Sequence, residues 1–197
     1  MTDNSLYQQA IERFSAWFAE VQTLDLAEPA AMSLATVDAD GKPSVRTVLL
    51  KAFDTRGFVF YTNKLSRKGR QIEQTRRAAL CFFWQPLMRQ VLVEGRVEDV
   101  AEAEADAYWA TRPRISQIGA WASMQSSVLS GRAELKHRYS NYEKRYADAS
   151  VPRPPHWSGY RVVPELIEFW SSRPGRLHER ERFFLEDGIW RNSLLYP

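Results

Sequence analysis

The hydrophobic residues near the N-terminus recur at intervals of three and four residues. Between Leu6 and Val21 the repeating positions are Ile11, Phe14, Trp17, Phe18 and Val21. This spacing places them on one face of a helix, so the sequence predicts an amphipathic helix here. Beyond the linker Ala27–Ala31 the pattern changes to short apolar runs separated by turn residues, which is typical of strands.

Most of the remaining chain divides into short strands and a few helices. Strands are expected at Met32–Val37, Pro43–Phe53, Phe58–Thr62, Ala78–Gln85, Gln90–Val100, Tyr160–Val163 leading into Glu165–Ser171, Arg176–Leu185 and Ile189–Leu195. Helices are expected at Ser66–Thr75, with Ser66 as N-cap, and at Ala101–Thr111, Ser116–Ser123 and Ala133–Ala147. Hairpin-joined strands with helices between them predict an α+β fold: an antiparallel β-barrel with peripheral helices.

The length of 197 residues suits one domain. We expect residues 1–197 to form it, with an N-terminal helical segment at 1–28 and a helical insertion at 101–149 between barrel strands. The run Ala78–Gln85 is almost continuously apolar, which predicts a strand buried on both faces.

Charge and composition exclude several classes of protein. The net charge is only +3 and no block of like charges occurs, which argues against a nucleic-acid binder. Cys81 is the one cysteine, so no intrachain disulfide forms, and its apolar surroundings predict burial. The three histidines lack metal-ligand spacing, so no metal site is expected. Neither a leader segment nor an apolar run of membrane length is visible, so we expect a cytoplasmic protein that does not bind membranes.

The stretch from Arg46 to Lys68 combines a hydrophobic hairpin with cations at its edges. Arg46 and Lys51 lie on the first strand, and Arg67 and Lys68 follow the second, at a helix start. Such an arrangement can hold an anion such as a phosphate, although an ordinary core hairpin with a solvated basic rim has the same pattern. Because Arg46 and Lys51 are five residues apart, a regular strand would point them to opposite faces. The two side chains can reach one site only if the strand has a bulge between them, or if each approaches the site from a different side.

Two further constellations could carry chemistry. In the predicted strand after Gly175, alternation places Arg176, His178 and Arg180 on one face, which suits a polar cleft as well as an edge strand with salt pairs. Tyr108 and Arg112 lie one helical turn apart and Ser116 follows, which suits a second phosphate cradle or a basic helix end. Two polar segments are weaker candidates: Gln125–Ser126–Ser127, and Gln90 on a valine-rich strand.

Common catalytic motifs are absent from the sequence. It contains no Gly-rich dinucleotide fingerprint, Walker A loop or Gly-x-Ser-x-Gly elbow. Two phosphate cradles without acid–base machinery fit a reaction whose difficult chemistry belongs to a cofactor.

From about Ala31 to the C-terminus, the chain resembles the pyridoxine/pyridoxamine 5′-phosphate oxidase family. The resemblance rests on blocks that occur in the family's order: RTVLLK, FYTN, SRK, RQVLVEG, RPRISQIGAW, QSS, IEFW and RLHER. Each block alone is weak, but the ordered set is highly specific. It implies a split β-barrel homodimer in which both chains contribute to each of two FMN sites at the interface.

The resemblance also implies the roles of individual residues. FMN would be bound by Arg46, Thr47, Val48, Leu49, Leu50, Lys51, Tyr61, Thr62, Arg67, Lys68, Gln90, Gln125, Ser126, Trp170 and Arg180. The substrate's phosphate would meet Lys51, Tyr108, Arg112 and Ser116. Arg176 and His178 would lie over the pyridine ring as catalytic residues that orient it and assist proton movement.

The implied reaction oxidises pyridoxine or pyridoxamine 5′-phosphate to pyridoxal 5′-phosphate. A hydride passes from the substrate's C4′ to flavin N5, and O2 then reoxidises the flavin and leaves as H2O2. The amine substrate also releases NH3, and the residues favour neither substrate over the other. The family's basic-aromatic N-terminal motif is not visible here, so we expect any lid over the site to come from elsewhere.

Two alternatives share the expected fold. One is a related split-barrel flavin oxidase acting on another heteroaromatic substrate, such as a phenazine precursor, which would not need the whole phosphate set. The other is a non-enzymatic flavin- or haem-binding protein, which would need no ring-orienting pair such as Arg176 and His178.

Overall fold

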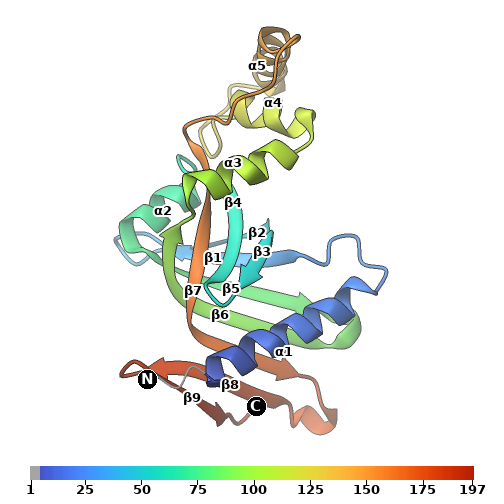
Figure 1. Cartoon of the computed structure of the whole chain (residues 1–197), viewed down its shortest axis with the longest axis vertical. Coiled ribbons are helices and arrows are strands. Elements are labelled where there is room, and N and C mark those ends of the chain that lie inside the picture. Colours follow the sequence, from blue (N-terminus) through green and yellow to red (C-terminus); the bar gives the residue numbers. More distant parts are fainter. Residues whose placement is uncertain (1–4) are drawn as a thin grey trace.

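The protein folds around one curled antiparallel sheet, described by a computed structural model over residues 5–197 (Figure 1). Its strands are β1 Ala31–Val37, β2 Pro43–Leu49, β3 Ala52–Asp54, β4 Gly57–Asn63, β5 Arg77–Trp84, β6 Arg89–Asp99, β7 Trp157–Ser171, β8 Glu179–Glu186 and β9 Ile189–Leu194. The main order is β2-β1-β5-β6-β7-β4-β3, with β8 between β7 and β9. This confirms the predicted α+β class and antiparallel sheet.

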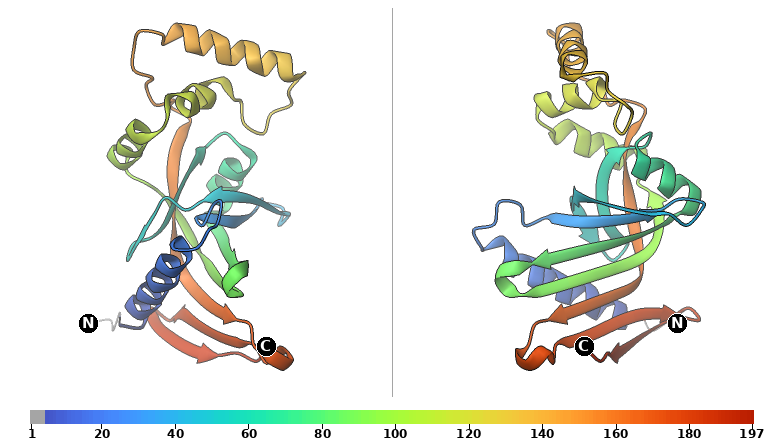
Figure 2. Two further views of the ribbon diagram at one scale, coloured as in Figure 1. Left: turned by 90° about the vertical axis from the view of Figure 1, so that its right-hand side faces the viewer. Right: turned by 180° about the vertical axis from the view of Figure 1, so that it is seen from behind.

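The helices lie outside the sheet: α3 to α5 at one end of the molecule, and α1 and α2 beside the strands (Figures 1 and 2). They are α1 Ser5–Gln22, α2 Arg67–Thr75, α3 Glu102–Thr111, α4 Arg114–Ala122 and α5 Arg132–Arg145, with short 3-10 turns η1 Gln85–Leu87 and η2 Pro174–Arg176. Helices α3 to α5 stack at the end opposite β8 and β9. None of the helices between residues 5 and 197 is long and apolar enough to cross a membrane.

The predicted N-terminal helix forms part of the core. Its residue Phe14 is fully buried, with ring centroids 4.9 Å from Phe53, 4.8 Å from Phe58 and 5.1 Å from Phe82. Burying one such side chain stabilises the fold by about 1.5–3 kcal/mol. The apolar stripe therefore fixes α1 against the sheet; residues 1–4 of the predicted N-terminal segment lie outside the described part of the chain.

Strand β7 connects the two halves of the sheet. Its first half pairs with β4 and its second half with β8, while β6 runs along its other edge. The sequence predicted two segments here, and the structure joins them through a register shift at Glu94/Gly95, opposite Pro164. A Cβ on Gly95 would lie 2.0 Å from the carbonyl oxygen of Val163, so only glycine fits at this bulge.

The prediction of one continuous strand over Pro43–Phe53 is wrong. The strand breaks at Leu50–Lys51, where the chain changes its partner. The amide of Leu50 donates to the carbonyl of Ala30 at 2.9 Å, whereas the amide of Lys51 donates to that of Val59 at 2.9 Å. Strand alternation therefore does not run from Arg46 to Lys51, which removes the objection to their sharing a site.

Two other predictions need correction. Strand β5 is buried on one face only: Phe82 is fully buried, but Phe83 is 51% exposed and Cys81 is half-buried. An open, curled sheet covers one face with its own core and leaves the other to be covered from outside. Arg176 does not lie on a strand, since it ends η2 with φ of 62° and β8 begins only at Glu179.

Candidate active site

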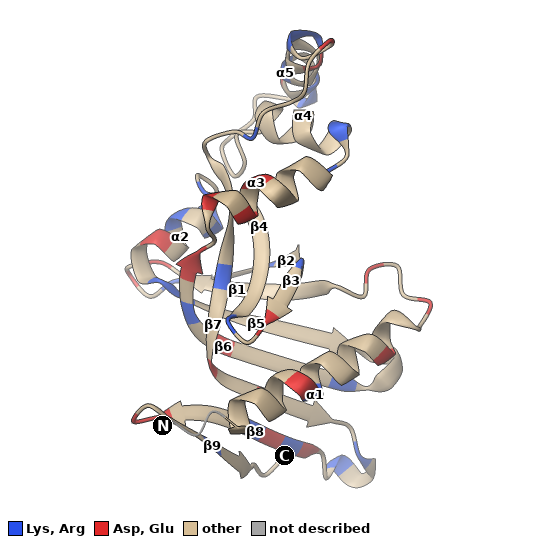
Figure 3. Cartoon of the chain, in the orientation of Figure 1, with Lys and Arg blue, Asp and Glu red and all other residues tan. Residues whose placement is uncertain are grey.

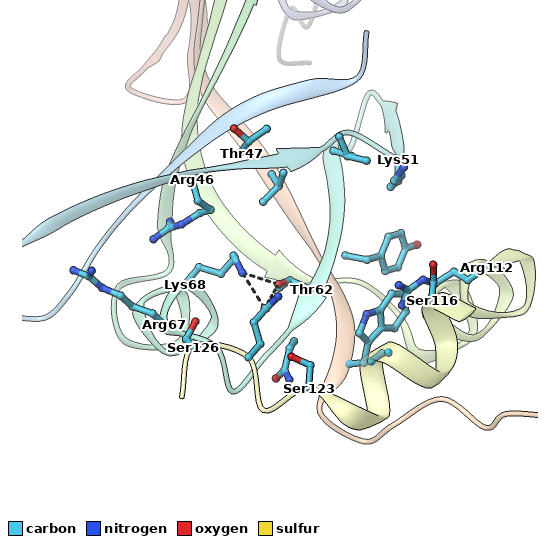
Figure 4. A pocket seen from close by; sticks show the side chains of 18 of the residues that line it. Arg46, Thr47, Lys51, Thr62, Arg67, Lys68, Arg112, Ser116, Ser123 and Ser126 are labelled. Atoms are coloured by element: carbon cyan, nitrogen blue, oxygen red, sulfur yellow. Dashed lines mark hydrogen bonds between the residues drawn. The ribbon is translucent and has the colours of Figure 1, made fainter. Parts of the chain in front are cut away.

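A cavity of about 800 Å³ opens between β2, β4 and helices α2 to α4 (Figure 4). Its size lies in the range of cofactor and small-molecule sites. The lining residues are Ser44, Val45, Arg46, Thr47, Val48, Leu49, Lys51, Tyr61, Thr62, Asn63, Arg67, Lys68, Tyr108, Arg112, Ser116, Gly119, Ala120, Ser123, Gln125, Ser126 and Trp157.

One side of the cavity carries Arg46, Arg67 and Lys68 (Figure 4). Ser66 caps α2 by accepting a hydrogen bond from the amide of Gly69, and this places the next two residues, Arg67 and Lys68, at the positive end of the helix dipole. The Lys68 ammonium donates to Gln125 Oε1 at 3.0 Å and to Thr62 Oγ1 at 3.1 Å. Burial, and then the charge of Arg46, lower the pKa of Lys68 to about 8.

A polar network behind the cavity fixes the Arg46 guanidinium. It donates to Thr36 Oγ1 and to Ser44 Oγ, each at 2.5 Å, and to the carbonyl of Leu34 at 3.2 Å. The two hydroxyls in turn donate to Oε1 of the buried Gln71 on α2, each at 2.6 Å. These partners are all neutral, so the network orients the charge of Arg46 without neutralising it.

The other side of the cavity carries Lys51, Arg112 and Ser116 (Figure 4). Arg112 is the extended C-cap of α3 rather than a helical residue, and α4 begins two residues later. Its guanidinium carbon lies 4.6 Å from the ring centroid of Trp157, and its Nη1 is buried without a hydrogen-bond partner. Burial also lowers the pKa of Arg112. A buried, unpaired donor on a cation indicates a place for an anionic ligand.

Stacked aromatic rings connect the strand side of the cavity with the helix side. Tyr61 on β4 and Tyr108 on α3 have ring centroids 4.1 Å apart and ring planes at 15° to one another. Tyr61 also stacks on Trp157, at 5.3 Å and 7°. These flat rings give the cavity a rigid apolar wall beside its cations.

The cavity is built for anions. None of the lining residues is Asp or Glu, whereas five are Lys or Arg. Within residues 5–197, no group of three or more His, Cys, Asp and Glu side chains could hold a metal ion. Cations held close together without carboxylates favour ligands that carry phosphate or carboxylate groups.

Most of the residues predicted to bind FMN or the substrate's phosphate line this one cavity. The exception among the early residues is Leu50, whose side chain is buried in the core at 5% exposure. Gln90, Trp170, Arg176, His178 and Arg180 do not line the cavity either.

These five residues lie on or next to adjoining strands and form what we call the C-terminal cluster. Trp170 pairs with Gln90 on β6 and with Arg180 on β8, and its ring centroid lies 4.8 Å from that of His178. Strand β8 lies at the opposite end of the long axis from α3 and α4, which border the cavity (Figure 1). One chain therefore does not bring the C-terminal cluster to its own cavity.

Sequence reasoning missed several residues that shape the cavity. Trp157 lies before the expected strand, which starts at Tyr160, yet β7 begins at Trp157. Gln71 and Thr36 carried no signal, since each is one polar residue within an ordinary helix or strand. The available hint for Trp157 was an aromatic residue two positions after the prolines of residues 151–155.

Comparisons with known proteins agree with this geometry. A family model described as pyridoxamine 5′-phosphate oxidase matches residues 8–170, and one described as the pyridoxine 5′-phosphate oxidase C-terminal dimerisation region matches residues 157–197. A pyridoxine/pyridoxamine 5′-phosphate oxidase of Myxococcus xanthus is 57% identical over 187 residues, covering 95% of this chain and 91% of the relative. A pyridoxine/pyridoxamine 5′-phosphate oxidase of Alkalilimnicola ehrlichii is 53% identical over 194 residues, covering 98% of this chain and 99% of the relative.

Solved structures show the same fold. PhzG from Burkholderia lata, in complex with tetrahydrophenazine-1-carboxylic acid, is 32% identical with a TM-score of 0.90, and the match covers 95% of this chain and 92% of that one. A pyridoxamine 5′-phosphate oxidase-related, FMN-binding protein from Nostoc punctiforme is 16% identical with a TM-score of 0.73, and the match covers 94% of this chain and 96% of that one. The latter likeness bears on the fold alone and supports the split barrel.

Proposed function

The chain belongs to the pyridoxamine 5′-phosphate oxidase family, and from this premise we propose that it is an FMN-dependent oxidase forming pyridoxal 5′-phosphate. Its substrates are pyridoxine 5′-phosphate and pyridoxamine 5′-phosphate, with O2 as the electron acceptor. The products are pyridoxal 5′-phosphate and H2O2, together with NH3 from the amine. FMN, when bound, supplies the hydride acceptor and the route for electrons to O2.

The observation that carries this proposal is the pair of cationic groups on opposite sides of one carboxylate-free cavity (Figure 4). Arg46, Arg67 and Lys68 form one group, and Lys51 with Arg112 forms the other. A flavin nucleotide and a phosphorylated substrate each carry one phosphate. Two phosphates at a common site need two separate groups of cations, because like charges repel.

The first group fits the phosphate of FMN. The dipole of α2 and the cations at its first turn favour a dianion, and the hydroxyls of Thr62 and Ser126 offer further hydrogen bonds. Burial, and then the charge of Arg46, lower the pKa of Lys68 to about 8, and a phosphate dianion beside it would favour the charged ammonium. Val48 and Leu49 on β2 offer apolar surface of the kind that a flavin ring requires.

The second group fits the substrate's phosphate. The free Nη1 of Arg112 would gain its missing partner, and Tyr108, Ser116 and Lys51 surround the same space. This phosphate acts as a handle: its binding energy holds the pyridine ring in one position against the flavin.

The C-terminal cluster completes the site in a homodimer. Residues 157–197, which match the dimerisation region, contain most of the cluster, and the exposed face of β5 offers apolar surface such as Phe83 to a partner. We place Gln90, Trp170 and Arg180 of one chain beside the FMN held by the other. Arg176 and His178 then lie over the pyridine ring, where they orient it and move a proton.

The main alternative is oxidation of a phenazine precursor, which the 32% identity to PhzG favours. The second cationic group argues against it, because Lys51 and Arg112 together match the double charge of a phosphate better than the single charge of a carboxylate.

Oxidation of pyridoxine 5′-phosphate in air tests the proposal. The protein loaded with FMN is expected to form pyridoxal 5′-phosphate and H2O2 in equal amounts, at a rate far above that with unphosphorylated pyridoxine. A protein that binds no FMN, or that prefers a dihydrophenazine carboxylate over the phosphorylated substrates, would rule the proposal out.

A further inference from the structure

Helix α3 leads directly into the proposed substrate-phosphate site. It carries Tyr108, and it ends at its C-cap Arg112. Its first half is acidic (Figure 3). The position of this helix relative to β4 therefore sets the distance between the two proposed phosphate sites.

A buried arginine on β7 holds the acidic half of α3. Arg161 is only 6% exposed, and its Nη2 donates to both carboxylate oxygens of Glu104, at 2.8 and 3.0 Å. Its Nη1 donates to Asp54 at the end of β3, at 3.3 Å. A guanidinium whose two terminal nitrogens donate to carboxylates on two different elements, Glu104 on α3 and Asp54 on β3, fixes orientation as well as distance.

Glu104 also connects this ion pair to the cavity. Its backbone carbonyl accepts a hydrogen bond from the Tyr61 hydroxyl at 3.4 Å, and Tyr61 stacks on Tyr108. Since Glu104 and Tyr108 are four residues apart on one helix, they lie on the same face. The contacts run without a gap from β7 through Glu104 to Tyr61 on β4 and Tyr108 on α3.

The energetics favour a geometric role for this pair. Removing an arginine from water is costly, so a buried ion pair often adds little net stability compared with apolar residues of similar volume. What such a pair does supply is a single relative placement of the elements it joins. Here those elements are β7, which pairs with β4, and α3, which leads to the substrate's phosphate.

We propose that Arg161 and Glu104 are positioning residues that hold α3 at the distance from β4 that the phosphorylated substrate requires. This inference rests on the proposed function, because it takes Tyr108 and Arg112 as ligands of the substrate's phosphate. It adds that the affinity for that phosphate depends on two residues that do not touch it.

The test is Glu104→Gln, which keeps the size of the side chain and one oxygen acceptor but removes the charge. We expect the Kd of pyridoxal 5′-phosphate, measured by tryptophan fluorescence, and the KM for pyridoxine 5′-phosphate to rise about tenfold. The Kd of FMN should change less than about twofold, since its cations lie on α2 and β2. Arg161→Lys, which has one nitrogen in place of the two that bond Glu104 and Asp54, should give the same pattern.

The matched control is Glu102→Gln on the same helix. Glu102 also pairs with an arginine, Arg153, but its side chain is 76% exposed, so its loss should alter neither ligand's affinity. Unchanged product affinity in Glu104→Gln, or equal losses of product and FMN affinity in both variants, would overturn the inference. A wild-type protein that neither binds pyridoxal 5′-phosphate nor oxidises its precursors would overturn the proposed function as well.

Discussion

Single residues in the cavity combine charge with burial, and Lys68 shows the consequence most clearly. Its pKa of about 8 lies below the usual value of 10.5 because burial and Arg46 disfavour the charged form. Phosphate binding requires the ammonium, so FMN affinity should be highest below pH 8. Above pH 8 the Kd of FMN should rise by up to about tenfold per pH unit, measured by flavin fluorescence from pH 6.5 to 9.5.

The titration of Lys68 should make the free energy of unfolding of the apoprotein rise with pH, whereas FMN affinity falls. Between about pH 8 and 10.5 the unfolded chain binds this proton and the folded chain does not, so the Lys68 contribution to folding stability rises with pH there. The arginine of Lys68→Arg stays charged over this whole pH range, so this variant should show a much weaker pH dependence of FMN affinity. If that variant kept the full pH dependence, another group would be responsible for it.

Arg176 belongs to the C-terminal cluster, and its predicted role is catalytic. It is exposed in its own chain and has a positive φ of 62°, so it contributes little to the chain's own packing. Arg176→Ala should lower kcat about 100-fold or more while FMN affinity stays within about twofold. The control is Arg173→Ala, which removes a nearby exposed guanidinium paired with Glu179. Parallel loss of turnover and FMN would assign Arg176 to the cofactor instead.

At the residue scale the sequence supported much of the candidate site, because ordered blocks such as RTVLLK and SRK identify positions directly. It did not reveal which uncharged side chains orient the charged ones. Gln71, Thr36 and Trp157 act through contacts between distant segments, and such contacts leave no local pattern.

At the scale of elements, α2 determines how the first cationic group is presented. Its N-cap Ser66 is fully buried and accepts from the amide of Gly69, and Gly69 itself has no room for a side chain because a Cβ would lie 2.1 Å from the Lys64 carbonyl oxygen. Ser66→Ala should lower the free energy of unfolding by about 1 kcal/mol, measured by urea denaturation. FMN affinity should fall too, whereas Ser150→Ala, at an exposed loop position, should change neither quantity. Unaltered FMN affinity in a measurably destabilised Ser66→Ala protein would separate the cap from the phosphate site.

Local periodicity predicted most elements well, because amphipathic helices and hairpins are encoded by neighbouring residues. The prediction of strands failed where the backbone stops pairing with one segment and begins to pair with another. The break at Leu50–Lys51 depends on hydrogen bonds to Ala30 and Val59, and the turn at Arg176 depends on a left-handed backbone. The apolar run of β5 was read as buried on both faces because hydrophobicity alone does not distinguish a core from a surface reserved for a partner.

At the scale of the whole molecule, the proposed oxidase site requires two chains. The cavity holds one part of the predicted set of residues and the C-terminal cluster holds the rest, at the opposite end of the long axis (Figure 1). In a twofold dimer each cavity can meet the partner's C-terminal cluster, which gives two identical composite sites. We therefore expect an inactive variant of the cavity and an inactive variant of the C-terminal cluster to complement one another.

Mixed dimers of Arg112→Ala and Arg176→Ala proteins test this claim most directly. Each homodimer alone should form almost no pyridoxal 5′-phosphate. After random exchange of equal amounts, half of the dimers are mixed, and each mixed dimer has one site made of two unaltered parts. The activity should therefore return to about a quarter of the wild-type value. Exchange that is confirmed by mass but restores no activity would contradict an oxidase site shared between two chains.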